Sequence, residues 1–170
     1  MGLLAWLGLQ RGTDYPNLNA LLAELRRALP NDESVVIRYL AIVIALLGRV
    51  AVVDGRFTDK EEKTLRSLLA HVDRLAPSGV DSVCDALRGE FPSLTGDEVD
   101  LCYREIKALC DGKERIDVLR VLTRLATADG DLSPEEDAEL RTIATQIGIP
   151  VGEFEAVVLE TKAGRSSPRA

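Results

Sequence analysis

The chain has 170 residues, of which 46% are hydrophobic and 29% are charged, a composition typical of one soluble globular domain with its own core. Its 28 acidic residues against 21 basic ones give a formal net charge of −7. This surplus of carboxylates excludes a nucleic-acid partner, because such a partner needs clustered lysine and arginine. Cations and basic protein surfaces are the partners that the charge favours.

Residues 1–16 form an apolar N-terminal segment, for which a short helix is the most structure that we expect. Residues 1–9 lack the basic region and the cleavage site of a signal peptide, and they are too few to span a bilayer. Gly2 is followed at position 6 by Trp6 instead of serine or threonine, so the myristoylation pattern is also absent. We therefore expect neither a leader peptide nor a lipid anchor here.

Apolar residues recur at helical spacing along the rest of the chain, and aromatic residues make up only 4% of it. We predict an all-α fold: a single-domain bundle of about seven to eight helices over residues 17–162, followed by a disordered tail at 163–170. Proline, glycine and asparagine residues mark the expected helix ends. The predicted helices cover residues 18–29, 33–53, 58–75, 80–89, 96–110, 113–129, 133–147 and 151–162.

The predicted helix 33–53 is the most apolar, and two arginines interrupt it. Arg38 and Arg49 are eleven residues apart, close to three helical turns, so they share one face with Ala41, Ala45 and Gly48. We interpret this segment as a buried central helix with a basic, small-residue stripe, and not as a membrane span. Together with helix 113–129 it is expected to form the centre of the bundle, where Leu46→Ala or Leu122→Ala would be costly.

Two stretches that lie 75 residues apart, 54–61 and 129–136, share the pattern Asp-Gly-x-apolar-[Ser/Thr]-x-x-Glu. The repeat predicts two related helix-turn-helix halves, near residues 33–75 and 113–147. Gly55 and Gly130 suit the left-handed conformation just past a helix C-terminus.

The end of each copy predicts a helix N-terminus. Thr58 and Ser133 are expected N-caps that form capping boxes with Glu61 and Glu136, respectively.

The acids of the repeat, Asp54, Glu61, Asp129 and Glu136, are our candidate metal ligands. Each copy resembles the second half of an EF-hand loop, but the positions that should begin the loop lie on apolar helical residues, so a true EF-hand is not predicted. Three interpretations stay open. The acids only cap helices, or they hold a divalent cation (Ca²⁺, Mg²⁺ or Mn²⁺), or they form an acidic patch that docks a basic protein.

The two copies are not equivalent. Residues 129–139 contain six carboxylates and no basic residue, whereas Arg56 and Lys60 lie among the acids of the first copy. Asp54 and Asp129 follow a helix C-terminus, where the helix dipole disfavours an anion. An Asx-turn, a cation or a buried arginine would offset that cost. The second copy is therefore the stronger candidate for cation binding.

The sequence offers no catalytic residues, and we do not expect an enzyme. The single histidine, His71, has no neighbouring thiols with which to form a zinc site, and Cys84, Cys102 and Cys110 contain no C-x-x-C pair. We expect these thiols to be buried and unreactive, in a reducing cytoplasm. A carboxylate-metal hydrolase is the only enzymatic alternative that remains, since nucleophilic and phosphate-binding motifs are absent.

The Asp-Gly turns of this all-helical chain resemble those of the tellurite-resistance TerB-like family. Residues 125–136 resemble the most recognisable segment of that family, residues 50–55 are a looser copy, and the resemblance covers about 33–160. It implies a bundle of two related halves in a bacterial cytoplasmic stress-response or metal-resistance system, with the paired acids as metal ligands. It also implies protein partners, through which the domain could associate peripherally with a membrane.

Overall fold

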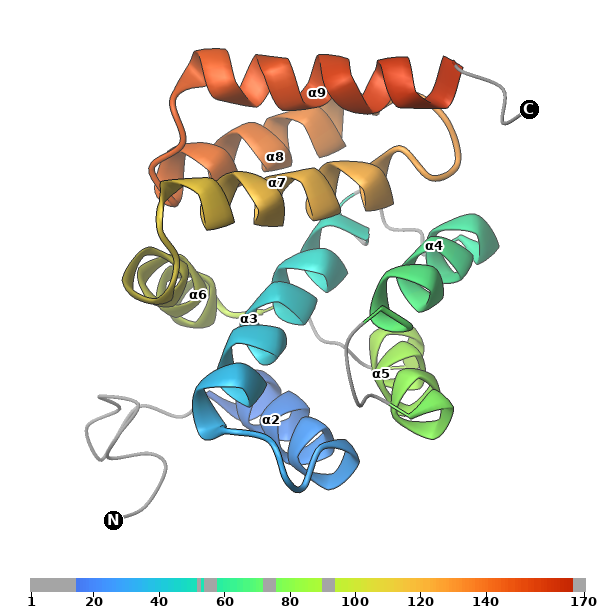
Figure 1. Ribbon diagram of the computed structural model, residues 1–170, viewed down its shortest axis with the longest axis vertical. Coiled ribbons are helices and arrows are strands. Elements are labelled where there is room, and N and C mark those ends of the chain that lie inside the picture. The colour runs from blue at the N-terminus through green and yellow to red at the C-terminus, as the bar shows by residue number, and fades with distance from the viewer. Residues whose placement is uncertain (1–14, 52, 54–57, 72–75, 90–93, 167–170) are drawn as a thin grey trace.

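The computed structural model describes residues 15–51, 53, 58–71, 76–89 and 94–166, and this part of the chain is helical with no strand. Figure 1 shows the arrangement of the helices. The all-α bundle is confirmed. The helices are α2 (Pro16–Ala28), α3 (Ser34–Ala51), α4 (Asp59–Leu69), α5 (Pro77–Gly89), α6 (Gly96–Leu109), α7 (Gly112–Ala126), α8 (Pro134–Gln146) and α9 (Val151–Ser166).

Capping boxes open four of these helices. In each box the N-cap side chain accepts a hydrogen bond from the backbone of a glutamate three residues on, and that glutamate accepts one from the N-cap backbone. The two boxes predicted for α4 and α8 are confirmed, and α6 and α7 carry two more. The N-cap and glutamate pairs are Thr58 and Glu61, Thr95 and Glu98, Asp111 and Glu114, and Ser133 and Glu136.

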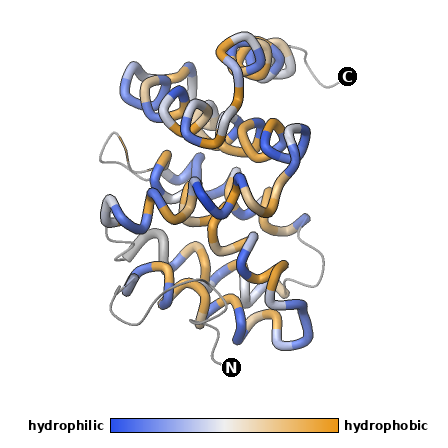
Figure 2. The backbone as a smooth tube through the Cα atoms, turned by 90° about the vertical axis from the view of Figure 1, so that its left-hand side faces the viewer, coloured by the Kyte–Doolittle hydropathy of each residue, from blue (hydrophilic) through white to orange (hydrophobic). Residues whose placement is uncertain are grey.

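Helix α3 runs through the middle of the molecule and packs against α2, α6, α7 and α8 (Figure 1). Helices α7, α8 and α9 lie together at one end of it, and α5 packs against α2 and α4. The predicted centre is confirmed, because Ala45 and Leu46 of α3 and Leu119 and Leu122 of α7 have no exposed surface. Figure 2 shows how the hydrophobic positions follow the helices.

By length and composition alone, α3 is apolar enough to cross a membrane. However, 61% of its residues are buried inside the protein, as expected for the central helix of a bundle. The buried position of α3 agrees with its interpretation as a central helix.

Several helix ends differ from the prediction: α4 stops at Leu69 instead of residue 75, and α5 begins at Pro77 instead of residue 80. Helix α7 stops at Ala126 instead of residue 129, and its end is closed by hydrogen bonds from the backbone N–H groups of Thr127 and Ala128 to carbonyls within the helix. Helix α9 continues to Ser166, the last described residue, past the expected start of the tail at residue 163.

The early end of α7 makes the prediction for Gly130 wrong. Gly130 does not adopt the left-handed conformation, because the helix ends four residues before it and the chain has already turned away. Among the described residues only Gly148, after α8, has a positive φ, at 80°. Gly55 lies outside the described residues, as do the N-terminal segment 1–14 and the final residues 167–170.

Candidate functional site

The turn between α7 and α8 presents its acids in two different environments. Glu136 is only 5% exposed, and its Oε2 accepts a hydrogen bond of 2.8 Å from the backbone N–H of Ser133. Asp129, Asp131 and Glu135 are exposed, and their carboxylates make no hydrogen bond or ion pair with another described residue. The turn thus separates one internal, structural glutamate from a group of solvated acids.

The first copy of the repeat can be described only in part, since Asp54 lies outside the described residues. Glu61 is 2% exposed, and its Oε2 accepts a hydrogen bond of 2.6 Å from the backbone N–H of Thr58. Glu62 is also buried and binds Arg66 one turn further along α4, with 2.7 Å between Oε1 and Nε. Glu61 therefore has the same structural role in α4 that Glu136 has in α8.

The two arginines of α3 pair with glutamates of other helices. Arg49 forms a two-point ion pair with Glu139 of α8, and Arg38 pairs with Glu105 of α6. The hydrogen bond that Arg49 donates to Glu139 raises the pKa of Arg49, whereas burial lowers the pKa of Arg38. These arginines hold α6 and α8 against the central helix, and neither offsets the charge of Asp129.

Within the described residues, Asp129 has neither an Asx-turn nor an arginine to offset its charge. Its carboxylate makes no hydrogen bond within the described residues, so it does not form an Asx-turn. Because α7 ends at Ala126, Asp129 is exposed to solvent beyond the last helical turn. The field of a helix dipole is weak at that distance in water, so the cost to be offset is smaller than the sequence implies.

In the part of the chain that the structure describes, no three Asp, Glu, His or Cys side chains lie close enough together to hold a metal ion. Of the four predicted ligands, Glu61 and Glu136 lie in separate capping boxes and Asp129 is exposed. With Asp54 outside the described residues, the complete set cannot be placed.

Comparison with known proteins shows the family of this chain. A family model described as tellurite resistance protein TerB matches residues 40–159, from the middle of α3 to α9, which is more than half of the chain. The chain belongs to the TerB family. Neither the curated proteins nor the solved structures gave a match to it. The matched span contains both Asp-Gly turns of the TerB domain.

The thiols and the histidine of this TerB domain take no part in a site. Cys84, Cys102 and Cys110 are free and buried, as predicted. Burial raises the pKa of each thiol, to about 12 for Cys102, so none is a thiolate at neutral pH. His71 is exposed at the end of α4, where its Nδ1 lies 2.6 Å from the carbonyl oxygen of Ser67.

The most connected acid of the TerB domain, Glu98, is one that our sequence analysis did not single out. It caps its own helix through Thr95, and it also accepts hydrogen bonds from the backbone N–H groups of Asn17 and Leu18 and from the side-chain amide of Asn17. One carboxylate therefore serves the N-termini of both α6 and α2. The Thr95-x-x-Glu98 pattern could have shown the first contact, but no local signal shows the second.

Proposed function

We propose that this protein is a non-enzymatic TerB domain that works as a helical adaptor in a bacterial stress-response or tellurite- and metal-resistance system of the cytoplasm. Its docking surface is the acidic turn face, which we define as the exposed carboxylates of Asp129, Asp131 and Glu135. A basic protein segment is the partner whose charge fits this face. Attachment to a membrane would then be indirect, through that partner.

The observation that carries this proposal is the division of the turn's acids between two roles. Glu136 stabilises the start of α8 through its capping box, and Glu139 is neutralised by Arg49. The three residues of the acidic turn face make no hydrogen bond or ion pair with another described residue, and they lie on the turn between α7 and α8 and on the first turn of α8. Charges that lie outside the packing of a protein are available to steer and orient a partner of opposite charge.

The absence of catalytic groups in the described chain supports a binding role. The thiols are buried, and the histidine is exposed with its Nδ1 next to a backbone carbonyl. Hydrolysis by a carboxylate-bound metal would need several acids that converge on one point, and the described acids do not.

The experiment that tests the adaptor proposal is capture of partners from the native host by the full chain. The test variant carries Asp129→Asn, Asp131→Asn and Glu135→Gln, which neutralise the acidic turn face without changing its shape. We expect this variant to lose a basic partner that the wild-type chain captures.

The matched control neutralises three exposed acids elsewhere, Asp97 and Asp100 of α6 and Glu155 of α9. It changes the net charge by the same amount and should retain the partner. Equal loss from both variants would mean that only the net charge matters, and equal retention would mean that the partner docks elsewhere. Either result would refute the proposal.

A second candidate function is binding of Ca²⁺, Mg²⁺ or Mn²⁺ by Asp54, Glu61, Asp129 and Glu136. The observation that favours it is that Glu136 uses only Oε2 in its capping box, so Oε1 keeps its lone pairs next to a turn rich in carboxylates. Hard oxygen ligands of this kind suit these cations. The adaptor remains the better supported function, because the described acids already have either a structural partner or full solvation.

A further inference from the structure

A surface pocket of about 380 Å³ lies where α4, α7 and α9 come together, and its lining includes neither the capping glutamates nor the arginines of α3. This volume is at the lower end of the range for small-molecule sites in proteins, which is roughly 300 to 1,000 Å³. The proposed adaptor function uses none of the side chains of this pocket. Residues of all three helices line it, with those of α7 at its centre: Thr64, Arg120, Arg124, Thr127, Glu160 and Thr161.

Two arginines line the pocket, and one of them, Arg124, brings to it a positive charge that no other described residue pairs with. Arg120 and Arg124 are four residues apart on α7, so their side chains project from the same face of the helix. The Arg124 guanidinium is exposed and makes no hydrogen bond or ion pair with another described residue. The pocket therefore contains an arginine whose whole donor set is available to a ligand.

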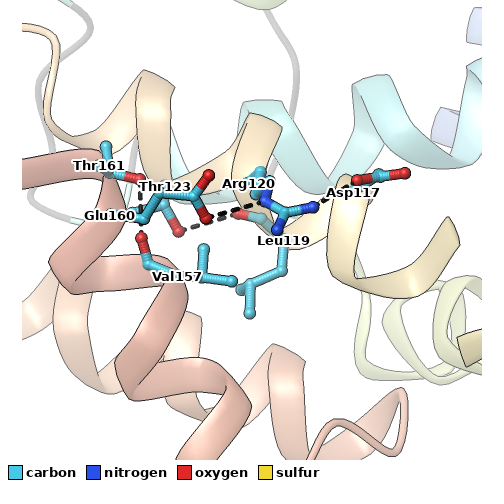
Figure 3. Close-up of polar contacts among 7 residues, drawn as sticks. All are labelled: Asp117, Leu119, Arg120, Thr123, Val157, Glu160 and Thr161. Atoms are coloured by element: carbon cyan, nitrogen blue, oxygen red, sulfur yellow. Dashed lines mark hydrogen bonds and ion pairs between the residues drawn. The ribbon is translucent and has the colours of Figure 1, made fainter. Parts of the chain in front are cut away.

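Figure 3 shows that Arg120 is held in place from both sides. Its Nε donates to Oε2 of Glu160 over 3.1 Å, and its Nη1 donates to Oδ1 of Asp117 over 2.7 Å. A guanidinium has five N–H donors, so these two bonds leave Nη2 with no partner and fix its direction. Arg120 is therefore shared between two carboxylates, and Arg124 is the lining arginine whose charge has no partner in the described chain.

Two of the three hydroxyl groups that line the pocket, those of Thr127 and Thr161, are left as acceptors. Thr127 donates its hydroxyl proton to the carbonyl oxygen of Thr123 over 2.9 Å, and Thr161 donates to that of Val157 over 2.9 Å (Figure 3 shows the latter). The hydroxyl oxygens of both threonines keep lone pairs for a donor. Thr127 and Ala128 also lie at the C-terminus of α7, where the helix dipole favours the positive end of a ligand dipole.

From this arrangement we propose that the pocket binds a small phosphorylated molecule that also carries hydroxyl groups. The phosphate group binds Arg124 and Nη2 of Arg120, because guanidinium groups match the geometry of phosphate oxygens. The hydroxyl groups of the ligand donate to Thr127 and Thr161 at the end of α7. Charge on one side of the pocket and acceptors on the other thus select the orientation of the ligand.

The test is calorimetric titration of the full chain with three probes: glycerol 3-phosphate, inorganic phosphate and glycerol. We expect saturable binding of glycerol 3-phosphate, weaker binding of inorganic phosphate and none of glycerol. The absence of saturable binding of glycerol 3-phosphate would overturn the proposal. Equal affinity for both phosphates would overturn the role of the hydroxyl groups. A parallel titration with Ca²⁺ or Mg²⁺ is included, and heat released only in that titration would show that the pocket binds a cation instead.

Variants with matched controls locate the binding. Arg124→Gln should raise the Kd for glycerol 3-phosphate about tenfold or more, as expected for one charge-assisted contact. Arg104→Gln removes the same charge from an exposed arginine of α6 that has no partner in the described chain, and it should leave the Kd unchanged. A similar loss in both variants would overturn the assignment.

Filling the pocket gives an independent test that leaves every charge in place. Gly164 lines the pocket, and a Cβ built there meets nothing within 4 Å, so Gly164→Leu can add a side chain at the pocket without a clash of its Cβ. Gly152→Leu is the control, at an exposed glycine near the start of the same helix where a Cβ is equally unobstructed. We expect Gly164→Leu alone to weaken binding, with both variants as helical as the wild type. Unchanged binding by Gly164→Leu would refute the site.

Discussion

Glu98→Gln is the substitution for which the structure makes the sharpest stability prediction. Oε1 of Glu98 accepts bonds from the backbone N–H groups of Asn17, over 3.0 Å, and Leu18, over 3.2 Å. Oε2 accepts bonds from the side-chain amide of Asn17, over 2.8 Å, and the backbone N–H of Thr95, over 3.0 Å. An amide nitrogen in place of either oxygen would face two donors, so glutamine cannot keep all four bonds.

The expected cost follows from the charge and burial of this carboxylate. Glu98 has no exposed surface, and hydrogen bonds to a charged group are worth about 1.5 to 3 kcal/mol each. With at least one bond lost and the others reduced to neutral strength, Glu98→Gln should lower the free energy of unfolding by about 2 to 4 kcal/mol. Glu136→Gln is the matched control and should cost less than about 1 kcal/mol, because an amide oxygen can keep its single capping bond.

Urea denaturation at pH 7, followed by circular dichroism, measures both changes. The comparison requires that the slope of the free energy of unfolding against urea concentration is the same for the variants and the wild type. The pH dependence is a second check. Burial by itself raises the pKa of Glu98, but the hydrogen bonds from Thr95, Asn17 and Leu18 outweigh it and leave the pKa below its ordinary value. Because the folded-state pKa is lowered, the stabilisation is complete above the unfolded-state pKa of about 4.3 and is lost as the pH falls through the folded-state value.

The wild-type chain should therefore lose more stability on acidification than the Glu98→Gln variant does. A cost for Glu98→Gln no larger than that for Glu136→Gln would refute the role of Glu98 in joining α2 to α6.

Three further predictions concern the core, the central ion pair and the thiols. Leu46→Ala and Leu122→Ala should each lower the free energy of unfolding by about 2 to 5 kcal/mol in urea titrations, since both side chains are fully buried; a cost near zero would contradict the packing. Arg49→Ala should cost about 2 kcal/mol because it leaves the buried carboxylate of Glu139 unpaired, whereas Arg49→Met combined with Glu139→Leu should recover most of that loss in the same assay. A thiol reagent at pH 8 should leave Cys102 unmodified in the native protein and modify it in urea, because burial raises its pKa to about 12; rapid modification of native Cys102, detected by mass spectrometry, would contradict its burial.

The sequence predicts the helices and their caps well because these depend on neighbouring residues. The spacing of apolar residues placed Leu46 and Leu122 in the core, and the Thr58 and Ser133 capping boxes follow from residues three positions apart. The conformation of Gly130 was predicted wrongly because it depends on where α7 ends, and helix ends are the least determined by local pattern.

The contacts that join the helices could not be predicted in the same way. Glu98 reaches Asn17 across 81 residues, and Arg49 reaches Glu139 across 90 residues. The sequence showed that Arg49 lies on the face of a buried helix, and a buried arginine needs a carboxylate, but many carboxylates were available. Only the packing of α8 against α3 selects Glu139.

The candidate site was predictable as a pattern but not as an arrangement. The repeat correctly indicated an acidic turn between two helices, and the TerB family assignment agrees with it. Whether its acids converge on a cation or face solvent depends on side-chain directions that the pattern does not contain. In the described chain Glu136 turns inward to its cap, whereas Asp129 faces solvent.

The most direct test of the adaptor proposal is the thermal midpoint of the full chain with and without 1 mM Ca²⁺, Mg²⁺ or Mn²⁺. A cation that binds only the folded state with a Kd of about 10 µM would add about 2.7 kcal/mol of stability, which corresponds to a rise in midpoint of roughly 5 to 10 °C for a chain of this size. We predict no rise, either for the wild type or for the Asp129→Asn, Glu136→Gln double variant. A rise of several degrees in the wild type that the double variant loses would contradict the proposal and establish the turn as a metal site.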